Sequence, residues 1–323
     1  MVAEPQVKAP VDRGRWLWHG AYALVIVALG GALYMASKRV DYTWRWERLP
    51  QYVISTEGEE IRAPFDGFVT LSADSKTLTM TEMKGAGVES YSGFAQVLVG
   101  QGDLVFQNDV LAKKPGIRPG PLLVGLWLTL EISAISLVFA LILGVVTGLG
   151  RVAQNPAARN LAATYVEIIR GTPLLVQIFI FYFFIGTVLQ LSAFTAGVAA
   201  LSVFTGAYIA EIVRAGIEGV ARGQMEAARS LGMSYAQAMR HIILPQALRK
   251  TLPPLAGQFI NLIKDSSLVS VMALTDLTKA GREVVSSTFS PFEVWFTVAA
   301  MYLLLTGSLS LLVRRLEKRL AHD

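Results

Sequence analysis

A polar segment between two apolar stretches has the most informative residue spacing in this chain. It reads Glu226-Ala227-Ala228, three residues, Gly232, nine residues, Ile242, one residue, and Leu244-Pro245. Glu226 supplies a carboxylate near the expected start of a helix, where it is stabilised and free to meet an arginine of another protein. The small alanines permit close approach to another surface. These residue types suit docking rather than bond-breaking chemistry.

We expect this segment to fold as two short helices that meet at an angle. Residues 224–231 favour a helix, and Gly232 can take the left-handed conformation that closes it. Ser234 is suited to cap a second helix over about residues 235–244. Pro245 lacks an N–H group, so it should end or kink that second helix. An amphipathic helix resting on lipid is the alternative interpretation.

Two pairs of opposite charges lie inside apolar stretches. Glu167 and Arg170 are three residues apart, as are Glu211 and Arg214, so each pair can form an intramembrane ion pair on one helix face. Ionisable groups at membrane depth are costly and face a helix bundle or a water-filled cavity. The pairs therefore either line a solute path or lock helices together, and the spacing alone leaves both interpretations open.

Three other residues are candidates for direct contact with a solute. Lys264 lies about 12 residues, or roughly 18 Å, into an apolar stretch that begins near residue 252. Asn261 precedes it by one helical turn, and Tyr208 lies in the preceding apolar stretch. A path with such groups suits a small zwitterion better than an apolar solute.

The composition indicates a helical integral membrane protein. Of 323 residues, 53% are hydrophobic and 16% are charged, whereas soluble domains carry roughly 25% charged residues. A membrane span needs about 20 apolar residues, and six stretches qualify. Their approximate bounds are 20–36, 122–149, 161–189, 193–217, 252–274 and 292–313.

Basic residues predict the orientation of these spans. The links 150–160 and 218–251 and the C-terminal end are rich in arginine and lysine. The positive-inside rule places all three in the cytoplasm. The first span is expected to be a retained anchor with a cytoplasmic N-terminus, and a cleaved signal peptide is the alternative. Both interpretations put residues 41–118 outside the cytoplasm.

Residues 41–118 differ from the rest in composition and predict a small β-rich extracytoplasmic insert. Short strand-like runs at 67–71, 77–81, 96–99 and 104–106 alternate with turn residues. The fragments 61–67 and 102–111 resemble halves of a biotinyl/lipoyl-type barrel, and Met83-Lys84 resembles its modified lysine dipeptide. The spacing departs from that family, so an unmodified barrel or an ordered loop that steadies a complex or touches a partner is expected.

The Glu226–Pro245 spacing resembles the EAA loop of ABC importer permeases at every position of that motif. The resemblance implies that this loop couples the permease to a separate ATPase subunit. More of the chain is similar to the polar amino-acid permeases of the histidine/glutamine/arginine type. The segments that carry this similarity are 165–175, 206–217, 244–247 and 264–268.

The resemblance covers about residues 121–320 and implies a five-span permease core. Residues 1 to about 118 fall outside it. Given the composition of that front part as well, we expect three domains: residues 1–40 as cytoplasmic N-terminus and anchor, 41–118 as insert, and 119–323 as core, with the coupling loop at about 221–250. The resemblance further implies a second permease chain, identical or related, an extracytoplasmic amino-acid-binding protein and a bacterial inner-membrane location. Import of polar or charged amino acids is the function expected.

Other functions lose support from what the sequence lacks. It has no phosphate-binding Gly-x-x-x-x-Gly-Lys-Ser/Thr loop, no zinc helix and no serine elbow. We therefore expect no catalysis, cofactor or metal site in this chain, and ATP hydrolysis in a partner. The net charge of +5 is scattered, which disfavours nucleic-acid binding. An ion-coupled secondary transporter and a membrane scaffold that acts through its outer segment remain as alternatives.

Overall fold

The computed structural model describes residues 15–39, 42–55, 58, 60–72, 76–83, 85 and 87–320. The chain divides into two compact units after Arg45. The first contains helix α1 (Arg15–Arg39), whose side chains are mostly exposed. Within it, Trp18–Arg39 is long and apolar enough to cross a membrane.

The second unit begins with a β-rich segment. A 3₁₀ turn (Trp46–Arg48) and helix α2 (Pro50–Val53) precede nine short strands. These are β1 (Ile54–Ser55), β2 (Glu60–Arg62), β3 (Gly67–Leu71), β4 (Thr77–Glu82), β5 (Val88–Ser92), β6 (Gln96–Val97), β7 (Leu104–Val105), β8 (Val110–Lys113) and β9 (Arg118–Pro119). They form antiparallel sheets in the orders β5-β4-β3-β7, β2-β8-β6 and β1-β9.

Strand alternation builds one small core in this segment. Val69 in β3 and Leu78 and Met80 in β4 are fully buried, while their neighbours along each strand are more exposed. Leu111 in β8 belongs to the same cluster, so the two larger sheets share it. Strands β3, β4, β6 and β7 lie at the four predicted runs, whereas β1, β2, β5, β8 and β9 were not predicted. Lys84 lies outside the described residues.

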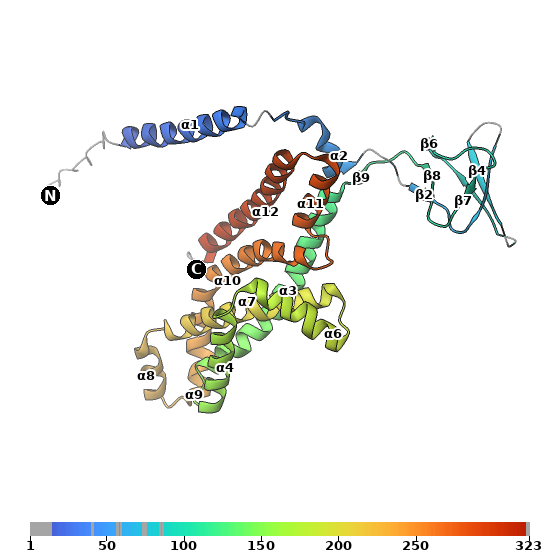
Figure 1. The fold of residues 1–323 in the computed structure, drawn as a ribbon. Helices are drawn as coiled ribbons and strands as arrows, with labels where there is room; N and C mark the ends of the chain where they lie inside the picture. Colours follow the sequence, from blue (N-terminus) through green and yellow to red (C-terminus); the bar gives the residue numbers. More distant parts are fainter. Residues whose placement is uncertain are drawn as a thin grey trace, which may run out of the picture. The chain divides into compact units, whose positions relative to one another are not determined.

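The helical part follows directly from β9. It comprises α3 (Pro121–Arg151), α4 (Pro156–Arg170), α5 (Leu174–Phe179), a π-helical segment (Ile180–Ile185), α6 (Gly186–Leu189), α7 (Ala193–Glu218), α8 (Arg222–Ser230), α9 (Tyr235–Ala238), a second π-helical segment (Met239–Ile243), α10 (Leu244–Asp265), a 3₁₀ segment (Ser266–Val271), α11 (Leu277–Thr288) and α12 (Pro291–Leu320). Figure 1 shows α3, α7 and α10 next to one another, in agreement with their contacts.

Helices α3 and α7 pack closely because glycine replaces larger residues between them. A Cβ at Gly144 would lie 2.5 Å from the Ile209 Cβ and 2.8 Å from the Gly206 carbonyl. A Cβ at Gly148 would lie 2.7 Å from the Val213 Cβ. Small residues allow helix backbones to approach in this way in membranes. Gly144 and Gly148 therefore form a packing seam between α3 and α7.

The structure corrects two of the six expected spans. Within the described residues, four helices are long and apolar enough to cross a membrane. The expected third span is instead bent by 102° between α4 and α5. Pro173 at this bend lacks an N–H group and disfavours helix at the residue before it. The Gln177 carboxamide donates instead to the Ile169 carbonyl at 2.7 Å and the Thr172 carbonyl at 3.2 Å.

The expected fifth span differs as well. Helix α10 starts at Leu244 and ends at Asp265, where a tighter 3₁₀ segment takes over. It is not among the four helices that qualify as spans by apolar length, and its sequence contains charged residues, glutamines and three prolines. The additional helix α11 was not predicted. Its Asp276 cap is fully buried and accepts from the Thr278 and Lys279 amides.

Candidate functional site

The segment between α7 and α10 folds as two short helices joined at Gly232. Gly232 has φ of +83°, as the sequence predicts. Its amide donates to the Arg229 carbonyl at 2.9 Å, and the Met233 amide donates to the Ala228 carbonyl at 3.1 Å. This pair of bonds is a Schellman motif that ends α8. The joint is thus set by one residue that tolerates the left-handed conformation.

The second helix starts and continues through local hydrogen bonds. Ser234 caps α9, and Gln237 completes a capping box with the Ser234 backbone. Pro245 was expected to end or kink this helix. The chain instead widens into the π-helical segment Met239–Ile243 and continues as α10, with Pro245 in its first turn. A wider turn is one way to accommodate the proline ring and its missing donor.

In the Glu226-Ala227-Ala228 segment, some side chains are exposed to solvent and others are buried. Glu226 and Ala227 are exposed, whereas Ala228 is buried. Glu226 is the fifth residue of α8, because this helix begins at Arg222. The expected stabilisation of Glu226 by a helix start therefore does not apply, since that effect fades beyond the first turn. The carboxylate remains available to a partner.

The loop is fastened to the helices on both sides. Ile243 packs with Ile217, Val220 and Ala247 in one apolar cluster, against which Ile242 and Leu244 also pack. The Lys250 ammonium donates to the Gly219 carbonyl at the end of α7 at 2.7 Å. The Gln246 and Gln224 side chains bond at 3.2 Å and join α10 to α8. Hydrogen bonds and apolar contacts therefore connect α8 to α10, and α10 to the end of α7.

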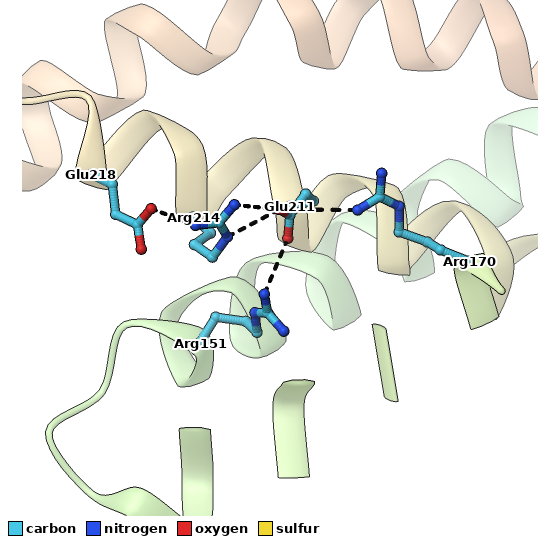
Figure 2. A network of polar contacts seen from close by, with 5 residues as sticks. All are labelled: Arg151, Arg170, Glu211, Arg214 and Glu218. Atoms are coloured by element: carbon cyan, nitrogen blue, oxygen red, sulfur yellow. Dashed lines mark hydrogen bonds and ion pairs between the residues drawn. The ribbon is translucent and has the colours of Figure 1, made fainter. Parts of the chain in front are cut away.

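A second polar site surrounds Glu211 on α7 (Figure 2). The Arg214 guanidinium donates to Glu211 Oε1 through two nitrogens, one of them at 3.1 Å, and also bonds to Glu218. Arg151, the last residue of α3, lies 3.7 Å from Glu211 Oε2. Arg170, the last residue of α4, lies 4.0 Å from Oε1. One carboxylate thus links the ends of two helices to α7.

This arrangement differs in part from the two predicted ion pairs. Glu211 and Arg214 are paired, but the expected pairing of Glu167 with Arg170 is not found among the described residues. Glu167 is exposed on α4, and Arg170 turns to Glu211 and the Tyr208 ring. The distance from the Arg170 guanidinium carbon to the centre of that ring is 5.2 Å, within the range of a cation–π contact.

The other expected solute-contacting residues lie on α10. Asn261 and Lys264 are exposed, and Lys264 is in the last turn of this helix. Because α10 begins at Leu244, Lys264 lies about 30 Å along it rather than 18 Å. A cation in the last helical turn is favoured by the helix dipole. Of the three residues, only Tyr208 belongs to the charged cluster.

Sequence reasoning missed three residues of these sites. Arg151 and Glu218 belong to the Glu211 cluster, and Gln177 satisfies carbonyls at the bend. The four-residue spacing of Arg214 and Glu218 was a usable signal. No local pattern connects Arg151 to Glu211, because 60 residues of chain separate them.

Similar proteins share the helical part of this chain. The family described as "Binding-protein-dependent transport system inner membrane component" matches residues 140–322. The probable glutamine ABC transporter permease protein GlnM of Bacillus subtilis is 48% identical over 197 residues, which are 61% of this chain and 91% of that protein. The glutamine transport system permease protein GlnP of Escherichia coli K12 is 40% identical over 204 residues, 62% of this chain and 93% of that protein.

Solved structures agree with this similarity. The structure described as an amino acid ABC transporter with histidines has a TM-score of 0.58 and 40% identity, and the match covers 62% of this chain and 94% of that one. A MetNI methionine ABC transporter structure has a TM-score of 0.56 at 21% identity and supports the fold alone. The resemblance to ABC importer permeases is thus confirmed, and this chain belongs to the family of binding-protein-dependent transport system inner membrane components.

Proposed function

We propose that this permease subunit imports polar amino acids and that its Glu226–Pro245 loop transmits the work of an ATPase subunit. The observation that carries the coupling role is the loop itself. It presents Glu226 and Ala227 outward on α8, while its ends are fastened to α7 and α10. A partner that binds α8 can therefore move α7 and α10 without contacting these two helices directly.

Glutamine is the first solute to test. Two relatives at 40% and 48% identity are named as glutamine permeases, and one structural neighbour is described as an amino acid ABC transporter. The polar groups Tyr208, Asn261 and Lys264 supply hydrogen-bond donors for a zwitterion with a polar side chain. Of these, Tyr208 with the neighbouring Arg170 is the better-supported contact for a carboxylate.

The proposal includes the partners and the orientation. An ATPase subunit docks on α8, a second permease chain completes the path, and an extracytoplasmic binding protein delivers the solute. The loop lies in the cytoplasm, α1 is a retained anchor, and the β-rich segment lies on the opposite side. The abundance of arginine in the loops beside Arg151 and Arg222 supports this orientation.

The test of coupling is uptake by the complete complex in lipid vesicles. We expect Glu226→Lys and Gly232→Asp to abolish ATP-driven glutamine uptake while the protein stays in the membrane. Glu89→Lys makes the same charge change in the β-rich segment and should leave uptake intact. Normal ATP-dependent uptake by both loop variants would refute coupling through this loop. Uptake that persists without ATP would instead favour an ion-coupled transporter.

A further inference from the structure

An apolar groove runs along the ends of three helices next to the coupling loop. Its volume is about 400 Å³. It is lined by Val145 and Leu149 of α3, Val213 and Ile217 of α7, and Leu248 and Leu255 of α10, among others. Thr251 also lines it, but its hydroxyl donates to the Leu248 carbonyl at 3.1 Å. This part of the groove therefore offers an apolar surface with no free hydrogen-bonding side chain among the residues named.

The groove is about as long as one leaflet of a bilayer is thick. Val145 lies six residues before the end of α3, which corresponds to about 9 Å of helix. Leu255 lies eleven residues into α10, which corresponds to about 16 Å. The hydrocarbon core of one leaflet is about 15 Å thick. The length of the groove along these helices therefore matches an acyl chain of one leaflet.

One basic residue lines the groove where the coupling loop joins it. Arg240 belongs to the π-helical segment before α10 and is exposed. No ion pair of Arg240 is found in the described part of the chain. An arginine without an acidic partner at a membrane interface attracts an anionic headgroup, and basic pockets between spans are typical sites for such lipids. The charge at the mouth therefore complements a phosphate.

We propose that this groove binds an anionic phospholipid of the leaflet on the coupling-loop side. One acyl chain lies along Val145, Val213 and Leu255, and the phosphate accepts hydrogen bonds from the Arg240 guanidinium. Leu244 and Pro245 also line the groove, so the lipid contacts the joint between the coupling loop and α10. The apolar lining offers few hydrogen-bonding groups to a polar, soluble partner.

The site can be tested by counting bound lipids on the purified permease–ATPase complex with native mass spectrometry. Phosphatidylglycerol and phosphatidylcholine with the same acyl chains are added separately after delipidation. We expect a preference for phosphatidylglycerol, and Arg240→Gln should reduce this preference about fivefold. Arg249→Gln is the matched control. Arg249 is exposed on α10 and does not line the groove, so its removal should leave the preference unchanged.

Two further arms separate the possible occupants. Leu248→Trp places a larger side chain in the groove. It should weaken binding of both lipids, because the indole occupies the space of the acyl chain. Inorganic phosphate should not displace the lipid, since it lacks the chain. Equal effects of Arg240→Gln and Arg249→Gln would show a diffuse basic surface and overturn the proposal. So would unchanged binding by Leu248→Trp, or loss of the lipid when the second permease chain assembles. The lipid count requires no transport, so it stands apart from the test of amino-acid uptake.

Discussion

At the scale of single residues, Glu211 is the most connected polar side chain described in the helical part. It is partly buried, and the guanidinium groups of Arg151, Arg170 and Arg214 all approach its carboxylate. Removal of one partner from a poorly solvated ion pair usually costs more than the pair itself contributes, because the other charge is left uncompensated. The cluster therefore stabilises the junction of α3, α4 and α7.

We predict that Glu211→Gln lowers the free energy of unfolding by about 2 kcal/mol, because Arg151 loses its counter-charge and Arg214 keeps only that of Glu218. Arg170→Gln should cost clearly less, since its side chain is 42% exposed and 4.0 Å from Glu211. Thermal unfolding of the purified protein in detergent measures both. Equal losses from the two variants would contradict the central position of Glu211.

Only part of this cluster could be predicted from the sequence. The Glu211–Arg214 pair follows from helical spacing, because residues three apart share a face. Arg170 has the same spacing to Glu167, yet the fold brings it to Glu211 instead. Arg151 could not be assigned at all. Its position depends on how α3 packs against α7, which is a long-range property of the chain.

At the scale of elements, the coupling loop depends on the backbone conformation of Gly232. A Cβ there would meet no atom within 4 Å, so any substitution acts through backbone strain alone. We predict that Gly232→Ala destabilises the loop by about 1 kcal/mol and reduces uptake per ATP hydrolysed. Both quantities can be measured on the same vesicles.

Gly223 offers a control for that prediction within α8. A Cβ at Gly223 also meets no atom within 4 Å, and its φ is not in the left-handed region. Gly223→Ala should stabilise the helix slightly, by up to about 1 kcal/mol, because alanine favours helix. Similar melting temperatures for the two variants would argue against strain at Gly232.

The seam between α3 and α7 gives a second prediction at this scale. Gly144→Ala would place a methyl group 2.5 Å from the Ile209 Cβ, so the helices must separate. Overpacking of this kind costs roughly 1–3 kcal/mol. Gly307→Ala on α12 has open space and should be neutral. Thermal unfolding of both variants in detergent tests this, and an unchanged melting temperature for Gly144→Ala would show that the helices can move apart freely.

Element types were easier to predict than element ends and bends. The apolar runs at α3, α7 and α12 predicted these helices, because long apolar runs suit the hydrocarbon of a bilayer. The bend at Pro173 was not predicted, although Gly171-Thr172-Pro173 contains two residues that disfavour helix. Pro245 was predicted to end or kink the helix, but the chain stays helical through a π-helical turn, with Ile243 and Ala247 packed in one apolar cluster.

At the scale of the whole molecule, the β-rich segment is inserted where two chain segments are paired. Strand β1 pairs with β9 through Ser55 and Arg118. Leu49 and Tyr52, which precede this pair, pack against α3, α11 and α12 residues such as Leu122 and Leu277. The residues between Ser55 and Arg118 are thus bracketed by a short antiparallel clamp that belongs to the helical part.

We predict that replacing residues 57–116 with a short Gly/Ser linker leaves part of the ATP-driven uptake intact. Partners in an antiparallel pair lie only about 5 Å apart, so a few residues span the gap. Deletion of residues 41–118 removes Leu49 and Tyr52 as well and should reduce the melting temperature further. Uptake by both variants in vesicles tests this, and complete loss of uptake from the shorter deletion would assign an essential role to the β-rich segment.

At the corner between α4 and α5, a side chain of the protein itself pairs the backbone carbonyls that the bend releases. Backbone carbonyls released by a sharp bend in a bilayer would ordinarily recruit water. The Gln177 carboxamide donates to two of them from inside the protein, so these carbonyls are paired within the protein although the chain turns through 102°. One side chain thereby does for these carbonyls what water would do at an unprotected corner.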